Sequence, residues 1–232
     1  MEPPSNNSPA KIMPWITASA RVLLLTVTMM PIASKATAAT GISAEVNTPA
    51  GLPITQGPGK AHIYGAELEL TGAFARLQFN LGTAYLHATV PSDFPFTLPN
   101  GVSVTIPEGT TVPFAPEWLA TAGVQYSFPV GTGSLTPRLQ YQYQGSQYTN
   151  IEYRIPLSFP YGELNDVVIP SHSTVDLRLK YAAAANWAIE GYATNLTNKV
   201  YISNVILSTG AAAPDISYGA PRQYGARLSY RF

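Results

Sequence analysis

The sequence contains no cysteine and carries little charge. Its 232 residues include 13 Lys plus Arg and 13 Asp plus Glu, so the net charge is zero and only 11% of the chain is charged. A chain without cysteine has no disulfide, thiol nucleophile or cysteine metal site, and a chain without basic excess does not suggest nucleic-acid binding. The 18 Gly, 21 Pro and 14 Tyr are more typical of strands and turns than of helices.

The amino end has the features of a secretory signal. Lys11 and Arg21 precede an apolar stretch at 22–33, and a small-residue sequence ending at Ala38 follows as the candidate cleavage site. The stretch is shorter than the roughly 20 residues of a membrane-spanning helix, and it contains Pro31. We therefore expect residues 1–38 to be a signal peptide-like segment, with a membrane-associated or buried helix as the alternative.

From residue 62 onward, apolar residues recur at every second position, which is the period of a β-strand. The segments with this pattern are 63–74, 76–90, 117–128, 135–149, 173–181, 187–196 and 223–232. The connections between them alternate in length, with short ones around 72–76, 129–134 and 182–186 and long ones at 91–116, 150–172 and 197–222. Short periplasmic turns and long extracellular loops are typical of outer-membrane barrels, whereas a soluble sandwich has no reason to alternate in this way.

The predicted fold is therefore all-β, an antiparallel transmembrane β-barrel segment of about seven to eight strands. An eighth strand is possible within 42–56, where Ile42, Ala44 and Val46 alternate. Aromatic residues that we expect at the periplasmic membrane boundary are Tyr126, Phe128, Tyr181, Trp187, Tyr230 and Phe232. Polar residues that lipid would not tolerate, and that we expect to face the lumen, are Arg138, Gln140, Gln142, Gln144, Asp176, Arg178 and Lys180.

Three stretches, GPGKAHIYGAELEL at 57–70, ATNLTNKVY at 193–201 and YGAPRQYGARLSYRF at 218–232, resemble the carboxyl-terminal barrel of TonB-dependent outer-membrane receptors. The residues that fit the family motif are Asn195, Leu196, Thr197, Lys199, Tyr201, Gly219, Pro221 and Arg222. The resemblance implies a large barrel of about 22 strands with an internal plug domain and a box that engages TonB. Neither plug nor box is visible in this sequence, so we expect 39–57 to be a linker or remnant strand and 58–232 the carboxyl-terminal barrel portion.

The resemblance also implies an outer-membrane receptor that takes up siderophores, cobalamin or oligosaccharides. Its partners would be outer-membrane lipid, a small-molecule ligand that the sequence does not identify, and the TonB complex if a plug and box exist upstream. Transport by this chain alone is not expected. The alternative is a stand-alone eight-stranded outer-membrane barrel with a structural or adhesion role. In the family, the terminal strand is also a signal for the barrel-assembly machinery, here Tyr224, Ala226, Leu228, Tyr230 and Phe232.

The sequence does not suggest an enzyme. His172 lies between two serines and near Asp176, but neighbouring residues of a strand point to opposite faces. His62 and His87 lack a carboxylate cluster with ligand spacing. We therefore predict no catalytic residue, metal site or cofactor.

Overall fold

The computed structural model describes residues 24–34, 44–47, 53–56, 60–97, 103–149, 168–206 and 215–232. Regular structure in these ranges consists of strands joined by turns and loops. They contain no helix with the length and apolar character needed to cross a membrane.

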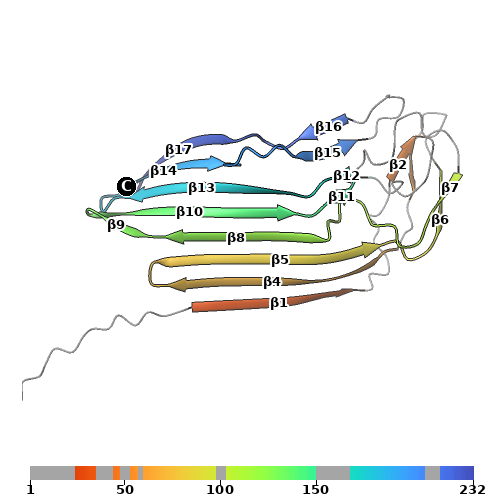
Figure 1. Ribbon diagram of the computed structural model, residues 1–232, viewed down its shortest axis with the longest axis horizontal. Helices are drawn as coiled ribbons and strands as arrows, with labels where there is room; N and C mark the ends of the chain where they lie inside the picture. The colour runs from red at the N-terminus through yellow and green to blue at the C-terminus, as the bar shows by residue number, and fades with distance from the viewer. Residues whose placement is uncertain are drawn as a thin grey trace, which may run out of the picture.

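A long antiparallel sheet dominates the molecule (Figure 1). Its strands, in spatial order, are β1 (Leu24–Ser34), β4 (His62–Phe74), β5 (Leu77–Thr89), β8 (Trp118–Tyr126), β10 (Gly133–Gln144), β13 (His172–Ala182), β14 (Trp187–Thr194) and β17 (Gln223–Tyr230). The short β9 (Phe128–Val130) pairs with the beginning of β10. Each of the seven alternating segments expected from the sequence overlaps one of these long strands, so the prediction of an antiparallel all-β fold is confirmed.

Four small two-stranded sheets lie at the opposite end of the molecule from the short turns (Figure 1). They are β2 (Ala44–Asn47) with β3 (Pro53–Gln56), β6 (Phe94–Thr97) with β7 (Ser103–Ile106), β11 (Gln147–Tyr148) with β12 (Val168–Ile169), and β15 (Ile202–Ile206) with β16 (Asp215–Tyr218). The long connections of the sheet therefore carry their own hairpins at one end.

The most deeply buried side chains belong to this loop end. Phe96 and Ile106 are fully buried within the β6–β7 hairpin and its surroundings, and Val90 and Ile169 are almost fully buried. By contrast, large apolar side chains of the long strands, such as Leu139 and Leu179, are 44% and 47% exposed. A single sheet with both faces open has no partner layer to bury them, so the apolar face needs a hydrocarbon environment instead of water.

The eighth long strand does not lie within 42–56, where the sequence suggested it, but at 24–34. Residues 44–47 and 53–56 form the small β2–β3 hairpin, and residues 24–34 form β1, which pairs with β4 over its whole length. Pro49, Gly51 and Pro53 interrupt the candidate stretch and disfavour a continuous ladder, whereas 24–34 contains Pro31 alone and lies at the sheet edge, where proline is tolerated. Residues 24–34 also fall in the segment 1–38, whose assignment as a signal stays a prediction.

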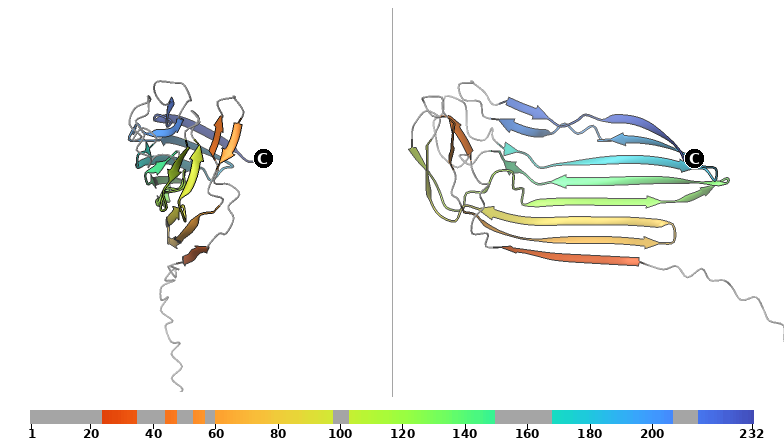
Figure 2. Two further views of the ribbon diagram at one scale, coloured as in Figure 1. Left: turned by 90° about the vertical axis from the view of Figure 1, so that its right-hand side faces the viewer. Right: turned by 180° about the vertical axis from the view of Figure 1, so that it is seen from behind.

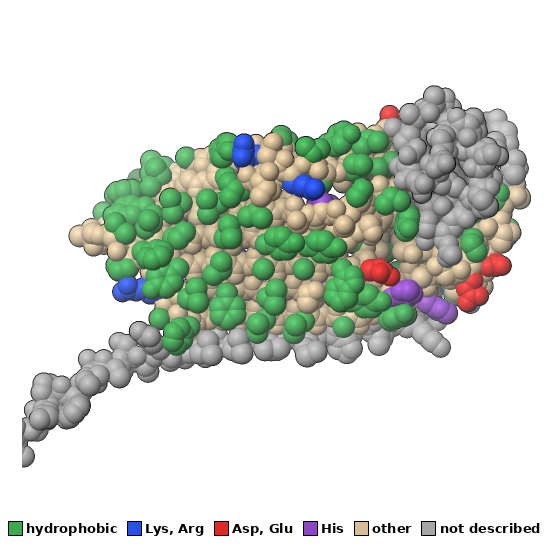
Figure 3. Space-filling model, in the orientation of Figure 1, with side chains coloured by type: hydrophobic (Ala, Val, Ile, Leu, Met, Phe, Trp, Pro, Cys, Tyr) green, Lys and Arg blue, Asp and Glu red, His purple; other side chains and the backbone are tan. Residues whose placement is uncertain are grey.

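The two faces of the sheet differ in chemistry. Seen along the strands, the sheet curves into an open trough (Figure 2, left). Its convex side carries rows of hydrophobic side chains (Figure 3). We call this convex side the apolar face; its exposed members include Leu81, Val124, Leu139, Tyr141, Leu177, Leu179, Ile189 and Leu228. The residues between them point to the other side of the sheet, which we call the polar face.

The assignment of faces predicts a directional effect of charge on β10. Replacing Tyr141 with Arg should lower the free energy of unfolding in phospholipid vesicles by about 2 to 4 kcal/mol, because a charge then faces the hydrocarbon near mid-strand. Its neighbour Gln142 lies on the polar face and is the matched control, with Gln142→Arg expected to cost less than about 1 kcal/mol. Denaturant titration of the refolded variants measures both; equal losses would contradict the assignment.

Candidate functional site: the polar face and the Asn195 turn

The strand register brings the polar residues predicted for the lumen onto one face. Arg138 stands opposite Arg178, Gln140 opposite Asp176, and Thr136 opposite Lys180 across the β10–β13 ladder. Gln142 and Gln144 follow on the same side of β10. All seven candidates, Arg138, Gln140, Gln142, Gln144, Asp176, Arg178 and Lys180, therefore share the polar face. That this face lines a water-filled lumen stays a prediction.

Arg138 is the centre of a polar network that crosses three strands. Its Nη1 donates to Gln125 Oε1 at 3.0 Å, and its Nη2 donates to Asn80 Oδ1 at 3.1 Å and to Gln140 Oε1 at 3.5 Å. Gln125 Nε2 donates in turn to Gln78 Oε1 at 2.9 Å. A Cβ atom at position 123 would collide with Asn80 Oδ1 and crowd Arg138, so Gly123 leaves the space that this network occupies. The sequence did not reveal that Gln78, Asn80 and Gln125 belong to the Arg138 network. Alternation along a strand shows which face of the sheet a residue occupies, but it does not show which residues of adjacent strands lie beside it.

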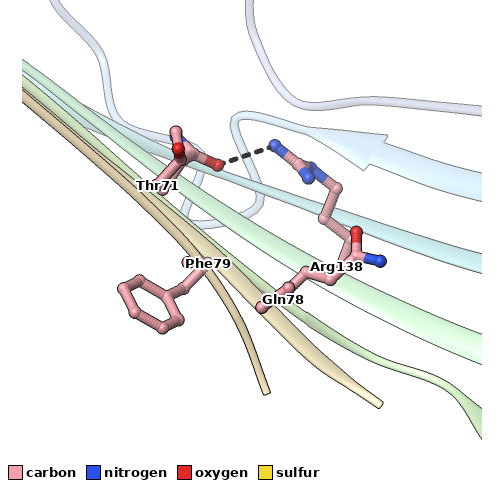
Figure 4. A pocket seen from close by; sticks show the side chains of 7 residues that line it. Thr71, Gln78, Phe79 and Arg138 are labelled. Carbon is pink, nitrogen blue, oxygen red and sulfur yellow. Dashed lines mark hydrogen bonds between the residues drawn. The ribbon is translucent and has the colours of Figure 1, made fainter. Parts of the chain in front are cut away.

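A shallow hollow lies beside this network on the polar face. It has a volume of about 260 Å³ and is lined by Thr71, Gly72, Ala73, Gln78, Phe79, Asn80 and Arg138. Arg138 reaches across the strands toward Thr71, whereas the Phe79 ring points away to the other side (Figure 4). Cationic and amide groups therefore surround a small space that is open to solvent.

Aromatic side chains mark both ends of the apolar face. At the turn end, the rings of Tyr126 and Phe128, Tyr181 and Trp187, and Tyr230 and Phe232 lie 4.5, 5.7 and 5.1 Å apart. These are the six aromatic residues that the sequence suggested for the periplasmic boundary. Their ring contacts fit such a girdle, because amphipathic rings favour the lipid–water boundary.

The structure adds a second group of aromatics at the loop end. Tyr64 stacks on His87 with a ring distance of 4.7 Å, and Tyr85 lies 4.9 Å from Trp118. The eight residue steps from Trp118 to Tyr126 correspond to about 26 Å along β8. This length matches the apolar band of about 25 Å in outer-membrane barrels. The sequence could have revealed this second group, because its aromatic residues occupy the alternate positions of their strands that face the apolar side.

The motif residue Asn195 organises the turn after β14. It is 5% exposed and has a positive φ of 46°, a conformation that Asn tolerates better than most residues. Its Oδ1 accepts from Lys199 N at 2.9 Å, and its Nδ2 donates to Lys199 O at 2.9 Å and Ala220 O at 3.0 Å. Its own N–H donates to Asp176 Oδ1 at 2.9 Å. One buried side chain therefore joins the end of β14 to the approach to β17.

The other motif residues complete the same junction. Arg222 N donates to Asn198 Oδ1 at 3.0 Å, and Arg222 Nη1 donates to the carbonyl oxygen of Leu196 at 3.2 Å. The backbone N–H of Gly219 donates to Tyr201 O at 2.9 Å, and a Cβ at this glycine would overlap the Tyr201 ring. That ring stacks on His172 at 4.2 Å. Thr197 and Pro221 lie on the exposed side of the junction. The structure therefore assembles the motif from two separate stretches of sequence.

The terminal strand presents an unshielded apolar row. Tyr224, Leu228 and Tyr230 are 68%, 73% and 62% exposed, and Phe232 at the chain end is fully exposed. Ala226 belongs to the same row. Within the described sheet, β17 pairs with β14 on one side alone. A signal that is read by the assembly machinery has to be accessible, and these five residues are. Their role as that signal stays a prediction.

The three histidines are dispersed over the described residues. His87 Nδ1 lies 3.5 Å from Glu117 Oε1, and His172 contacts the Pro170 carbonyl oxygen and the Tyr201 ring. No group of three or more His, Asp or Glu with metal-binding geometry occurs in the part of the chain that the structure describes.

The Asn195 turn predicts a strong effect of a small substitution. Asn195→Ala removes the three hydrogen bonds that the buried Asn195 side chain makes to backbone groups of Lys199 and Ala220, so the free energy of unfolding should fall by about 2 to 4 kcal/mol. Thr197→Ala, at an exposed position of the same motif, should change the free energy of unfolding by less than about 0.5 kcal/mol. Denaturant unfolding of both variants in detergent or lipid tests this, and equal stability would show that the turn is dispensable.

Comparison with solved structures shows the fold. The ferric yersiniabactin uptake receptor FyuA of Yersinia pestis is similar over 75% of this chain, with a TM-score of 0.59 and 20% identity. The ferric preacinetobactin receptor BauA of Acinetobacter baumannii is similar over 90%, with a TM-score of 0.53 and 21% identity. The ferripyoverdine receptor of Pseudomonas aeruginosa matches over 90%, with a TM-score of 0.51 and 18% identity. The chain spans about a quarter of the length of these receptors, covering 24%, 26% and 24% of them.

Sequence comparison identifies the family. No curated protein sequence matches the chain significantly. The family model "TonB dependent receptor-like, beta-barrel" matches residues 34–196, which is more than half of the chain and includes β4 to β14. Members of this family are outer-membrane transport receptors. The chain belongs to the TonB-dependent receptor β-barrel family of the outer membrane.

Proposed function

We propose that this chain forms the carboxyl-terminal wall of a TonB-dependent receptor that imports ferric siderophores across the outer membrane. The observation that carries the proposal is the sheet of eight long strands, apolar on its convex face and polar on its concave face, in a chain of this family. The similar solved structures are receptors for ferric yersiniabactin, ferric preacinetobactin and ferripyoverdine, which favours iron chelates over cobalamin or oligosaccharides.

The free edges of the sheet support a larger barrel. In hydrocarbon each unpaired backbone group costs several kcal/mol, so spanning sheets must close. In the described residues, β1 pairs with β4 and β17 with β14, and the two edge strands do not pair with each other. Both edges can therefore accept further antiparallel strands, as a wide barrel requires.

The polar face would line the lumen of this receptor. Its amides, hydroxyls and charges can replace water around a hydrated ligand, while the apolar face meets lipid. In this proposal the chain contributes part of the wall of the passage. Energy from the TonB complex would act through a plug domain and a TonB box, neither of which is recognisable in these 232 residues.

The stand-alone eight-stranded barrel is the second candidate, and the number of long strands favours it. It requires β1 to pair with β17, which closes a narrow barrel whose interior side chains would fill. Such a barrel would show heat-modifiable migration as a purified chain of 24.8 kDa.

Product size distinguishes the two candidates. An epitope tag inserted between residues 150 and 172 of the chromosomal gene leaves the terminal strand intact. On a denaturing immunoblot of outer membranes, we expect a band several times larger than the 24.8 kDa of this chain. A folded outer-membrane band of the chain's own size would overturn the receptor proposal.

The transport role is tested separately by deleting the gene and measuring the uptake of radioactive iron supplied with each of a panel of siderophores. Iron uptake should fall for at least one siderophore.

The terminal strand gives a prediction about assembly. Replacing Phe232 with Ala should lower the amount of protein in the outer membrane several-fold, since an exposed terminal aromatic is part of the proposed assembly signal. Arg231→Ala, at the neighbouring position with the opposite strand parity, is the control and should leave that amount unchanged. Quantitative immunoblotting of fractionated membranes measures both; equal amounts would remove Phe232 from the signal.

A further inference from the structure

We propose that the hollow beside Arg138 is a binding site for a free oxyanion, such as the carboxylate of a small molecule, on the lumenal wall. The inference rests on the proposed function, because it needs the polar face to be in contact with water. It goes beyond that function by naming a contact point for anionic ligands within the sheet, away from the long loops.

The first argument is the uncompensated charge of Arg138. Its three side-chain partners, Gln125, Asn80 and Gln140, are neutral amides. The two ion pairs found among the described residues join His87 to Glu117 and Arg178 to Glu190, so no carboxylate there lies within 4.0 Å of Arg138. A guanidinium held in place by amides keeps its full charge and is pre-organised to receive an anion.

The second argument is the sign of the surrounding charge. Arg178 stands directly opposite Arg138, and Lys180 and Arg227 lie on the same face in the next row. On this part of the polar face Glu190 is engaged with Arg178 at 3.8 Å, and Asp176 accepts the Asn195 N–H. Glu69 lies on β4 two residues from Thr71, on the same face and toward the loop end, and Glu67 lies one same-face position further away. The cation directly opposite Arg138 on the ladder is Arg178, so the Arg138 end of the hollow favours an anion.

The third argument is the shape and lining of the hollow. Its volume of about 260 Å³ holds several water molecules at about 30 Å³ each, or a small oxyanion with part of its hydration. The hydroxyl of Thr71 and the Nδ2 and Nε2 groups of Asn80 and Gln78 line the hollow together with Arg138 and can donate hydrogen bonds into it. A charged donor beside several neutral donors is the composition of an oxyanion site.

The chemistry of the hollow indicates brief binding. It is open to solvent and shallow, so a bound anion would remain partly hydrated and the affinity would be low. A low-affinity site suits a passage, because a ligand that binds too tightly to the wall would not leave it. The structure therefore assigns Arg138 as a contact for anionic ligands during passage.

Fluorine NMR tests this with the receptor product purified from outer membranes in detergent. Trifluoroacetate is the probe, and its line broadening is titrated against wild type and Arg138→Gln. Wild type should bind trifluoroacetate, and Arg138→Gln should weaken binding about tenfold or more, since a charge-assisted hydrogen bond is lost. Lys180→Gln removes a neighbouring cation that does not line the hollow and should change affinity less than about threefold. Neutral trifluoroacetamide should bind neither protein.

Three results would overturn the inference: no broadening with wild type, equal affinities for wild type and Arg138→Gln, or equal losses in Arg138→Gln and Lys180→Gln. If Arg138→Gln does not fold, Thr71→Val decides. It removes a hydroxyl donor of the hollow without changing charge and should weaken binding about threefold. Unchanged binding would contradict the site. These outcomes leave product size and iron uptake untouched, so failure of the anion site is distinguishable from failure of the receptor proposal.

Discussion

The interior of a lipid bilayer offers no water to backbone or side-chain polar groups, and this constraint explains most of the architecture. The long strands pair their backbone N–H and C=O groups with one another in a continuous ladder from β1 to β17, and of the long strands described only these two edge strands pair on one side alone. The same constraint separates the side chains, so that Leu139 and Tyr141 share one face and Arg138 and Gln140 the other. Because the unpaired edges of β1 and β17 would face hydrocarbon without hydrogen-bond partners, further strands are needed to pair with them.

Polar groups carry the specificity that a single sheet cannot obtain from a packed core. Asn195 uses all of its side-chain hydrogen-bonding groups to join β14 to the approach to β17. Arg138 joins β5, β8 and β10 through amides. The hydrogen bonds of Asn195 and Arg138 both connect separate strands to one another without placing polar groups on the lipid-facing side. They also explain why Gly123 and Gly219 stand where larger residues would collide with Arg138 and Tyr201.

Period-two alternation predicted the seven long strands after residue 62, because a half-apolar strand must alternate wherever it separates lipid from water. It also placed Arg138, Lys180 and their neighbours on one face. It did not predict β1, since 24–34 lies in the apolar stretch that was interpreted as part of a signal segment, and it missed the contacts of Asn80 with Arg138 and of Asn195 with Ala220. Those contacts join residues 58 and 25 positions apart, which a local pattern cannot reveal.

Because residues 1–232 contain no cysteine, single cysteines introduced into this sheet allow a direct test of the central claim that one face meets lipid and the other water. Single cysteines placed at Leu139, Gln140, Tyr141 and Gln142 can be labelled in outer membranes with a small, charged thiol reagent. The account predicts that cysteines at Gln140 and Gln142 react rapidly and that those at Leu139 and Tyr141 are protected. Uniform labelling along β10, or labelling with the opposite alternation, would contradict it.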